Sequence, residues 1–328
     1  MRILLWHVHG SWTTSFVQGD HDYLLPLTPG RDPDGLGRAR TWDWPASTVE
    51  VPAGELHDAD LDVVVLQRPH ELELVERWTG RRPGCDVPAV YVEHNTPGGA
   101  VPYTRHPLAE QSAIPVVHVT HFNRLFWDCG DAPTHVVEHG IVDPGPRYTG
   151  ELPRAAVVVN DPVRRGRAVG TDLLPDLSRS APLDVFGMRV AGLDGALGLP
   201  PERLGTFDDL PQARLHAELG RRRVYVHTSR WTSLGLSLLE AMHLAMPVVA
   251  LATTEASEAV PPGTGVVSTR PADLADAVRR LVADPDEARA VGERAREAVL
   301  ARYGLARFLA DWDDRLAAAV SVPARARR

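Results

Sequence analysis

The chain of 328 residues contains no lysine, and all 35 of its basic residues are arginines. A mechanism that forms a Schiff base or uses a lysine nucleophile is therefore excluded. Any site that binds phosphate through basic side chains must use arginine, whose guanidinium can donate two parallel hydrogen bonds to phosphate oxygens. The absence of lysine thus narrows both the possible chemistry and the residues that can recognise an anion.

Cysteines and long apolar segments are also scarce. Cys85 and Cys129 are too few for a disulfide scaffold or a cysteine-based zinc site, and we expect both to be reduced in a cytoplasmic protein. The apolar run at the start has the length of a strand rather than that of a signal peptide. No stretch approaches the ~18 apolar residues of a membrane span. The net charge of −8 argues against nonspecific binding to nucleic acid, which needs a basic face.

Motifs for metals and dinucleotides are missing as well. No HExxH or Cys/His zinc pattern is present, although eleven of the 14 histidines lie before residue 150. The acidic residues Asp58, Asp60 and Asp62 precede a predicted strand, and we interpret them as solvated. The first predicted strand leads into no Gly-x-Gly-x-x-Gly, which disfavours a nucleotide-binding dehydrogenase. We therefore expect neither a metal ion nor a bound cofactor.

Apolar runs of strand length recur along the chain and alternate with helical patterns. Several runs are apolar on both faces, as in a parallel sheet covered by helices. A segment rich in Pro and Gly, residues 143–153, predicts a linker between two such series. We therefore predict an α/β protein with two Rossmann-like domains, residues 1–147 and 148–303, followed by a C-terminal helix and tail, residues 304–328.

Residues 229–251 carry the most informative pattern. Residues 232–235 make a small polar turn, and every third residue from Leu236 to Met242 is then apolar, as in a helix with one apolar face. A turn that leads into a helix N-terminus can bind an anion, because free backbone N–H groups and the helix dipole favour a phosphate there. Glu240 lies about one turn inside this helix, within reach of a ligand held by the turn.

The same segment also has a purely structural interpretation. Ser237-Leu-Leu-Glu240 fits a capping box, in which the glutamate satisfies the N-cap amide and binds no ligand. A phosphate-binding turn with one glycine is a weak signal by itself. The helix pattern alone leaves both interpretations open.

Several motifs of the second half follow one another in a recognisable order. They are Leu204–Leu210, Gly235–Met242, Pro247–Ala250, Glu258–Val260 and Gly265–Val267. Together they resemble the motifs of the family 4, or group 1, glycosyltransferases, which are retaining enzymes of the GT-B fold. The first half of the chain resembles this family only loosely. The family usually has two glutamates eight positions apart; here the second is Glu240, whereas the first position holds Thr232.

The resemblance implies two Rossmann-like domains that face each other across a cleft, with a last helix that crosses back to the first domain. The second domain would bind a nucleoside-diphosphate sugar, and the first would bind an acceptor. Glu240 would hold the ribose hydroxyls, and the amides of the preceding turn would contact the diphosphate. The predicted donor-binding residues of this segment are Ser233, Leu234, Gly235, Leu236 and Glu240.

Arginines follow the first predicted strand of the second domain. In the family an arginine and a lysine at this place grip the donor pyrophosphate, so the resemblance implies that Arg164 and Arg165 bind it and stabilise the departing diphosphate. Charge alone would favour a solvated basic loop, and the position after a strand is what favours binding. Arginines and a helix dipole would then neutralise the charge of the departing diphosphate in place of a metal ion.

Two residues of the first half are further candidates. His94 ends the predicted strand 87–92, and the carboxyl edge of a parallel sheet is where α/β proteins bind ligands. Related enzymes carry a histidine here beside the donor sugar, so the resemblance makes His94 a catalytic residue that positions the sugar. Gly10, in the turn after the first strand, would let the backbone approach the donor closely. Packing roles are the alternatives for both, and Trp42 and Trp44 either line an acceptor groove or pack.

The sequence thus predicts a metal-independent glycosyltransferase that transfers a sugar, with retention, from a nucleoside-diphosphate sugar. The acceptor is a glycan, a lipid or a small natural product. Two alternatives share the fold. One is a sugar-nucleotide epimerase. The other is a degenerate subunit that binds a sugar nucleotide without turnover, and it remains an alternative because Thr232 replaces the usual glutamate. We expect no nucleic-acid partner and no membrane span, whereas peripheral contact with a membrane stays open.

Overall fold

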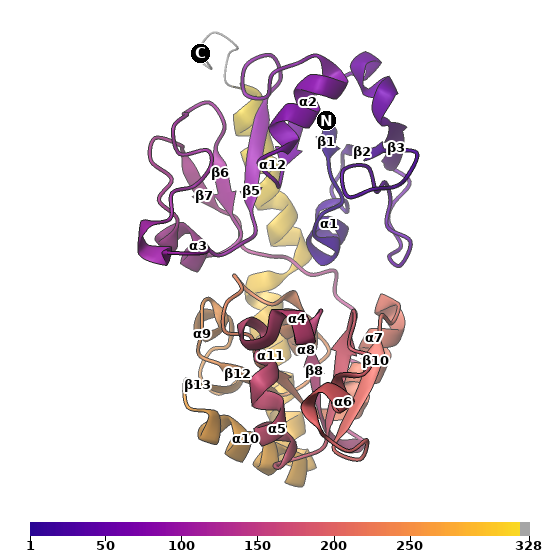
Figure 1. The fold of residues 1–328 in the computed structure, drawn as a ribbon, viewed down its shortest axis with the longest axis vertical. Helices are drawn as coiled ribbons and strands as arrows, with labels where there is room; N and C mark the ends of the chain where they lie inside the picture. Colours follow the sequence, from indigo (N-terminus) through magenta and orange to yellow (C-terminus); the bar gives the residue numbers. More distant parts are fainter. Residues whose placement is uncertain (322–328) are drawn as a thin grey trace. The chain divides into compact units, whose positions relative to one another are not determined.

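A computed structural model describes residues 1–321, and the chain forms two compact units (Figure 1). The first unit contains Met1–Val142 and the segment from Leu305 onward, and the second contains Asp143–Gly304. The sequence placed the boundaries after residues 147 and 303, whereas the divisions in the structure follow residues 142 and 304. The predicted tail beyond residue 321 lies outside the described residues.

The first unit is built on a parallel sheet whose strands run in the order β3-β2-β1-β4-β5-β6-β7. These strands are β1 (Arg2–Leu5), β2 (Asp22–Leu27), β3 (Thr48–Pro52), β4 (Val63–Leu66), β5 (Ala89–Glu93), β6 (Val116–His118) and β7 (Thr134–Val136). The central strands β4 and β5 are buried along their whole length, which is why they read as continuous apolar runs.

The apolar runs predicted β1 and β4–β7 but not β2 and β3. β2 contains Pro26, and proline usually argues against a strand because it cannot donate to the sheet. The strand tolerates Pro26 near its end, where the proline carbonyl accepts a hydrogen bond from the N–H of Gly37 at 3.1 Å. β3 forms the edge of the sheet and is mostly half-buried or exposed, so it shows no apolar run.

The helical elements of the first unit include the last helix of the chain. They are α1 (Gly10–Phe16), α2 (Glu71–Thr79), α3 (His121–Phe126) and α12 (Leu305–Ser321), with the 3-10 turns η1 (Ala53–Asp58) and η2 (Val101–Tyr103). The Trp312 ring of α12 packs edge-on against Trp12 and Phe16 of α1, with ring centroids 5.6 and 5.2 Å apart. Such aromatic pairs contribute about 0.5–1.5 kcal/mol each beyond their burial. The helix that follows the second unit therefore completes the core of the first.

The second unit is built on a second parallel sheet with the strand order β10-β9-β8-β11-β12-β13. Its strands are β8 (Leu152–Val158), β9 (Leu183–Gly187), β10 (Leu204–Asp208), β11 (Arg222–His227), β12 (Val248–Leu251) and β13 (Gly265–Ser268). Its helical elements are α4 (Pro162–Arg165), η3 (Gly166–Val169), η4 (Thr171–Leu173), α5 (Leu174–Ser178), α6 (Leu193–Leu197), α7 (Gln212–Arg221), α8 (Leu236–His243), α9 (Ala256–Ala259), α10 (Pro271–Ala283) and α11 (Pro285–Tyr303). The prediction of two α/β layers with parallel sheets is confirmed.

The predicted linker is bound along the second unit before it enters β8. The N–H of Thr149 donates to the carbonyl of Gly220 at 2.8 Å, and the N–H of Tyr148 donates to that of Leu244 at 3.0 Å. A Cβ at Gly220 would lie 2.4 Å from the carbonyl oxygen of Arg147, so this close approach requires glycine. Proline and glycine therefore mark an irregular but packed segment here.

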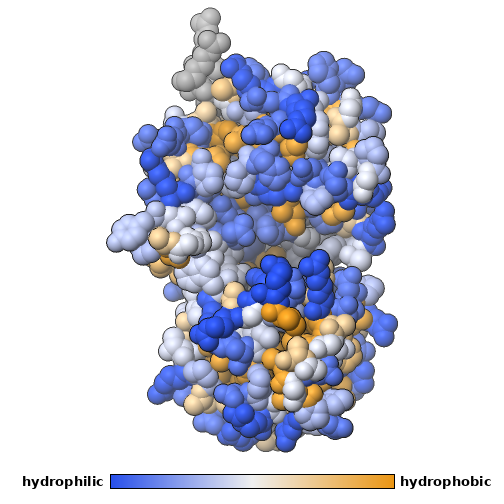
Figure 2. Space-filling model, in the orientation of Figure 1, coloured by the Kyte–Doolittle hydropathy of each residue, from blue (hydrophilic) through white to orange (hydrophobic). Residues whose placement is uncertain are grey.

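The parallel strands bring the candidate residues to the carboxyl edge of each sheet. Gly10 and His94 follow β1 and β5 of the first unit, and Arg164 and Arg165 follow β8 of the second. Hydrophilic residues predominate on the visible face of each unit, with apolar residues in small groups (Figure 2). Among residues 1–321, no helix has both the length and the apolar character needed to cross a membrane.

Candidate functional site

The loop after β8 leads into α4, which carries the two candidate arginines. Asp161 precedes this helix with a positive φ of 53°, and Pro162 occupies its first position, where the fixed φ of proline fits. The Asp161 carboxylate forms ion pairs with Arg164 and with Arg189, the latter at 3.2 Å. The hydrogen bond from Arg164 is the main cause that holds the pKa of Asp161 below its usual value. Arg164 is therefore already engaged by a carboxylate.

Arg165 has a different environment from its neighbour. Its side chain is half-buried and makes no hydrogen bond or ion pair with any residue between 1 and 321. Burial, and then the positive charge of Arg164, lower the pKa of Arg165. A partly buried guanidinium without a carboxylate partner is destabilised, and an anion bound beside it would remove that cost. Of the two predicted arginines, Arg165 is the one left open to an anion.

Hydrogen bonds tie the arginine loop to the loop after β11. Arg230 donates two to the Asp172 carboxylate, at 2.5 and 3.0 Å, and a third to the carbonyl of Arg167 at 2.8 Å. The backbones meet at Gly170, whose φ is 76° and where a Cβ would lie 2.1 Å from the carbonyl oxygen of Thr228. The two loops are therefore held together as one surface at the carboxyl edge of the second sheet.

The turn before α8 presents free backbone donors. The helix begins at Leu236 with Gly235 as its N-cap, and no side chain caps it. The N–H groups of Ser233, Leu234, Gly235 and Leu236 donate to no other atom within residues 1–321. Four unsatisfied N–H groups at a helix N-terminus carry partial positive charge, which the helix dipole reinforces. This arrangement favours an anion, and in particular a phosphate.

The start of α8 rules out the capping-box interpretation of Ser237 and Glu240. A capping box needs the serine at the N-cap, whereas Ser237 is the second residue of the helix and its hydroxyl lies 2.8 Å from that of Tyr225. Glu240 is buried, and its Oε2 lies 3.5 Å from the His216 Nε2. The carboxylate is thus placed one turn inside the helix, as predicted, but it does not cap it.

The prediction of a single apolar face on α8 is wrong. Every residue from Leu238 to His243 is buried, because the helix packs against β11, β12, α7 and α11. A helix covered on all sides gives no clear 3.6-residue contrast between faces. At its start, Gly235 is needed for packing, because a Cβ there would lie 2.4 Å from the His227 ring. Thr232, where the resembled family has its first glutamate, is half-buried in the same turn.

In the first unit, His94 is buried at the end of β5. Its Nε2 lies 3.0 Å from the Gln67 Oε1, and the Gln67 amide nitrogen donates to the carbonyl of Trp6 at 2.7 Å. Because that bond turns the Gln67 oxygen toward His94, the ring carries its proton on Nε2 and keeps Nδ1 as an acceptor. Burial, and then the charges of His9 and His139, hold the pKa of His94 well below its usual value. His94 is therefore neutral at pH 7.

Two further histidines belong to the surroundings of His94. The ring centroid of His9 lies 4.0 Å from that of His94, and burial lowers the pKa of His9 to about 4. His139 follows β7, and neither of its buried ring nitrogens has a hydrogen-bond partner among residues 1–321. Burial lowers the pKa of His139 to about 3. We call His9, His94 and His139 the histidine cluster; it is polar but uncharged at pH 7.

The spacing of the histidines does not produce a metal centre in the described part of the chain. Within residues 1–321, no group of three or more His, Cys, Asp or Glu side chains is arranged to hold a metal ion. His118, one of the histidines with metal-like spacing, is instead buried with its Nε2 3.5 Å from the Cys129 sulfur. Burial lowers the pKa of His118 to about 3.

Gly10 is the first residue of α1, and its missing side chain is explained by packing. A Cβ at Gly10 would lie 2.4 Å from the indole of Trp42, which fills the space beside it. Trp44 is buried and donates from Nε1 to the Thr14 hydroxyl at 2.9 Å, so it packs rather than lines a groove. The binding role of Gly10 stays a prediction, and the structure gives this glycine an additional reason to be small.

Sequence reasoning missed three residues that organise these edges: Gln67, Asp172 and Arg230. Gln67 directly follows β4, so the same strand-end signal that selected His94 would have found it. Asp172 and Arg230 have no such signal, because their pairing joins positions 58 residues apart in the chain.

One protein family matches part of the second unit. Residues 202–298 match the model of the family described as glycosyl transferases, group 1. The matched residues run from just before β10 into α11 and include the turn with the free N–H groups, α8 and Glu240. Over this segment the chain is similar to the group 1 glycosyltransferases. Arg164 and Arg165 lie before the matched segment, and no curated protein sequence matches the chain.

Solved structures match this chain over nearly its whole length. Sucrose-phosphate synthase from Thermosynechococcus elongatus is 17% identical, with a TM-score of 0.70 over 97% of this chain and 98% of that one. HepE from Anabaena, solved with UDP-glucose, is 16% identical, with a TM-score of 0.70 over 97% of this chain and 100% of that one. AviGT4, a glycosyltransferase involved in avilamycin A biosynthesis, is 16% identical, with a TM-score of 0.61 over 98% and 99%. At these identities the likeness establishes the fold, which is GT-B.

Proposed function

We propose that this protein is a glycosyltransferase that transfers a sugar from a nucleoside-diphosphate sugar to an acceptor, with retention of configuration and without a divalent metal. The row of four free N–H groups before α8 carries the proposal, because a diphosphate is the part of such a donor that these groups recognise best. Arg165 supports it with a half-buried positive charge on a loop that is bonded to the loop leading into this turn. Both features favour an anionic ligand over a neutral one.

The second unit would hold the nucleotide part of the donor. Glu240 would accept hydrogen bonds from the ribose hydroxyls, as the resemblance implies. Arg165 and the free N–H groups would stabilise the charge that develops on the diphosphate as its bond to the sugar breaks. A hydrogen bond to a charged group contributes roughly 1.5–3 kcal/mol, so several such donors together would replace a metal ion. Arg164, already paired with Asp161, would add to the positive field rather than bind alone.

In the first unit, we assign His94 the role of positioning the sugar. Its Nε2 proton is used by Gln67, so its Nδ1 would accept a hydrogen bond from a sugar hydroxyl. A neutral imidazole suits a neutral hydroxyl, because no ionic charge has to be desolvated. Retaining transfer by attack on the same face of the sugar, as the resemblance implies, requires no protein nucleophile.

The donor and the acceptor need separate tests. HepE was solved with UDP-glucose, which makes this the first donor to try. A thermal-shift panel of UDP-, GDP-, ADP- and dTDP-sugars would identify the nucleotide, because a ligand at about 100 times its dissociation constant adds ~2.7 kcal/mol to stability. The donor that binds best is then incubated with glycan, lipid and small-molecule extracts. No shift with any sugar nucleotide would contradict the proposal.

The metal requirement is tested in the same assay. Turnover should be unchanged after treatment with EDTA. Turnover that EDTA abolishes and Mg²⁺ or Mn²⁺ restores would contradict the metal-independent part of the proposal while leaving glycosyl transfer intact.

Both cysteines are free thiols, which supports a cytoplasmic site of action.

Thr232 favours one second candidate, a subunit that binds a sugar nucleotide without turning it over. The residue lacks the charge of the glutamate that the resembled family usually has at this position. If the donor binds but neither transfer nor hydrolysis follows, and Thr232→Glu creates activity, the protein is a binder. An epimerase would instead convert the labelled donor to an isomer in the absence of any acceptor.

A further inference from the structure

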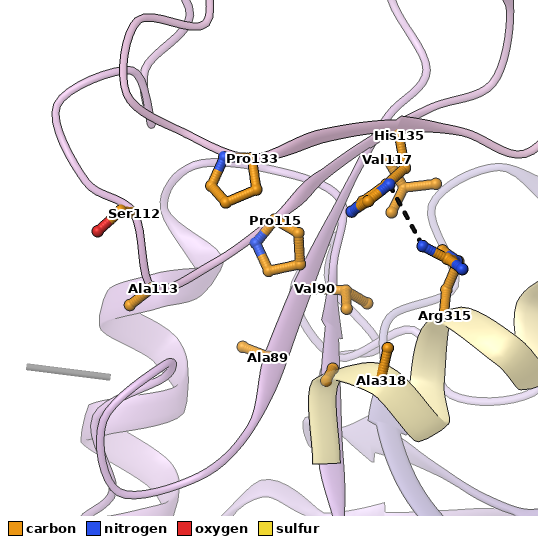
Figure 3. A pocket seen from close by; sticks show the side chains of 11 residues that line it. Ala89, Val90, Ser112, Ala113, Pro115, Val117, Pro133, His135, Arg315 and Ala318 are labelled. Atoms are coloured by element: carbon orange, nitrogen blue, oxygen red, sulfur yellow. Dashed lines mark hydrogen bonds between the residues drawn. The ribbon is translucent and has the colours of Figure 1, made fainter. Parts of the chain in front are cut away.

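A pocket opens in the first unit at the amino-terminal edge of its sheet (Figure 3). It lies between the starts of β5, β6 and β7 and the last turns of α12, whereas His94 and Gly10 belong to the opposite, carboxyl edge. Its volume is about 200 Å³. An apolar cavity of ~150 Å³ is enough to bind benzene, so this one has room for a six-carbon ring or chain with a polar group attached.

The walls of the pocket are mostly apolar. They are formed by small alanine, valine and proline side chains, including Ala89, Val90, Pro115, Val117 and Pro133. Residues of this size leave open space next to a sheet that larger side chains would fill. Such walls favour the apolar body of a small molecule over bare inorganic ions.

One end of the pocket is basic. Arg315 of α12 and His135 of β7 lie together there, and the Arg315 Nη1 donates to the His135 Nδ1 at 3.3 Å (Figure 3). Burial, and then the charges of Arg315 and Arg124, lower the pKa of His135, so this ring is neutral at pH 7 and serves as the acceptor. Arg315 has no carboxylate partner within residues 1–321, and its other N–H groups remain available.

We infer that this pocket binds a small organic monoanion, a carboxylate on an apolar body about the size of benzoate. The carboxylate would accept two parallel hydrogen bonds from the Arg315 guanidinium, and the body would lie against Val90, Pro115 and Val117. The positive charges of Arg315 and Arg124 act in the same direction at this end. The inference does not depend on glycosyl transfer, because the pocket and the donor-binding loops belong to different units.

A purely structural role for Arg315 makes a different prediction. In such a role Arg315 would only tie α12 to β7, through its hydrogen bond to His135. In that case, replacing Arg315 would lower stability, and an anion would have no preference over a neutral molecule of the same shape. A comparison of benzoate with benzyl alcohol separates the two roles.

The test is calorimetry on the full-length protein with benzoate, benzyl alcohol and sulfate as probes. Benzoate should bind at least tenfold more tightly than either of the others. Arg315→Gln should lower the benzoate affinity tenfold or more, which is the usual effect of losing a hydrogen bond to a charged group, and should leave benzyl alcohol unchanged. Arg77→Gln is the matched control, because Arg77 is an exposed arginine of α2 in the same unit, and it should change neither affinity.

A second variant tests the location. Ala318 lines the pocket from the exposed side of α12, so Ala318→Phe should fill the cavity with little effect on melting temperature and should abolish binding of benzoate. Equal binding of benzoate and benzyl alcohol, equal binding of benzoate and sulfate, or no binding of benzoate at millimolar concentration would each overturn the inference. Benzoate binding that survives both Arg315→Gln and Ala318→Phe would overturn it as well.

Discussion

The two units share a parallel-sheet architecture, but their carboxyl edges hold polar groups in different states. The edge of the first unit carries the histidine cluster, in which His94 and His139 are buried, His9 is half-buried, and all three are neutral at pH 7. The edge of the second unit carries arginines, carboxylates and a row of free N–H groups. The first arrangement suits hydroxyl groups and the second suits phosphates. The same kind of sheet thus serves two kinds of recognition through the loops at its edge.

The charge states follow from how much of each group is exposed. Burial is the first cause of the lowered pKa of His9, His94 and His139, since a buried imidazolium would lose its hydration. In the second unit, arginine partners are the first cause of the lowered pKa of Asp161 and Asp172, because these pairs keep contact with water. Four experiments test this difference between the units.

Acidification should affect the first unit most. The pKa values of His9, His118 and His139 are about 4, 3 and 3 in the folded state, against roughly 6.5 when unfolded. Their stabilisation is therefore complete above pH 6.5 and is lost as the pH falls from there toward 4, because the unfolded chain binds protons first. At pH 5 each of these histidines lowers the free energy of unfolding by about 2 kcal/mol, so the three together lower it by on the order of 6 kcal/mol.

Tryptophan fluorescence can follow this loss, because seven of the eight tryptophans belong to the first unit. In the second unit, burial lowers the pKa of His227 to about 4 and also lowers the pKa of His243, so fewer buried histidines respond to acid there. The lowered pKa values of Asp161 and Asp172 give stability that is lost only in more acidic solution, below their usual value of 3.8. Hydrogen exchange at pH 7 and pH 5 should show faster opening of the first unit. Equal acceleration in both units would remove the proposed difference.

Arg165→Ala should weaken binding of a free nucleoside diphosphate by tenfold to a hundredfold. Its guanidinium has no partner within residues 1–321 and would supply a charged hydrogen bond worth roughly 1.5–3 kcal/mol. Arg164→Ala is the matched variant and should have a smaller effect, because Arg164 already pairs with Asp161. Isothermal titration calorimetry measures both variants and the double variant. Wild-type affinity in the double variant would show that the phosphate site does not include the arginines of α4.

His94→Ala should lower the rate of sugar transfer about three- to tenfold, the usual effect of losing a neutral hydrogen bond of ~0.5–1.5 kcal/mol. Its affinity for the free nucleotide should stay unchanged, because the proposed contact is with the sugar. Gln67→Leu keeps His94 but removes the acceptor that holds its Nε2 proton, so it should show part of the same loss. A folded His94→Ala protein with wild-type turnover would make His94 a packing residue.

Glu240→Gln should have the smallest effect, a two- to tenfold loss of nucleotide affinity. The substitution keeps the shape of the side chain but removes the charge that would accept from two ribose hydroxyls. Melting temperature should change little, because Glu240 does not cap α8. Calorimetry with the nucleoside diphosphate and a thermal melt of the same sample distinguish the two roles. Unchanged affinity with a clear loss of stability would assign Glu240 a structural role, such as its contact with His216.

The sequence by itself determined the fold class and the segments from which the candidate sites are built. Runs that are apolar on both faces, such as those of β4 and β5, are typical of a parallel sheet covered by helices. Such a sheet sends its strand ends to one edge, which is why His94, Arg165 and the turn before α8 could be selected from sequence. The absence of lysine determined that any basic phosphate ligand is arginine.

Only the tertiary structure decided which side chain of each local group is available to contact a ligand. Arg164 and Arg165 are adjacent in sequence, but the Asp161 carboxylate pairs with Arg164 and leaves Arg165 unpaired within residues 1–321. The proton of His94 is held on Nε2 by Gln67, which lies 27 residues away in the chain. Local patterns determine strands and helices because they report burial of nearby residues. Hydrogen-bond partners and protonation states depend on contacts between distant segments, which exist only after the chain has packed.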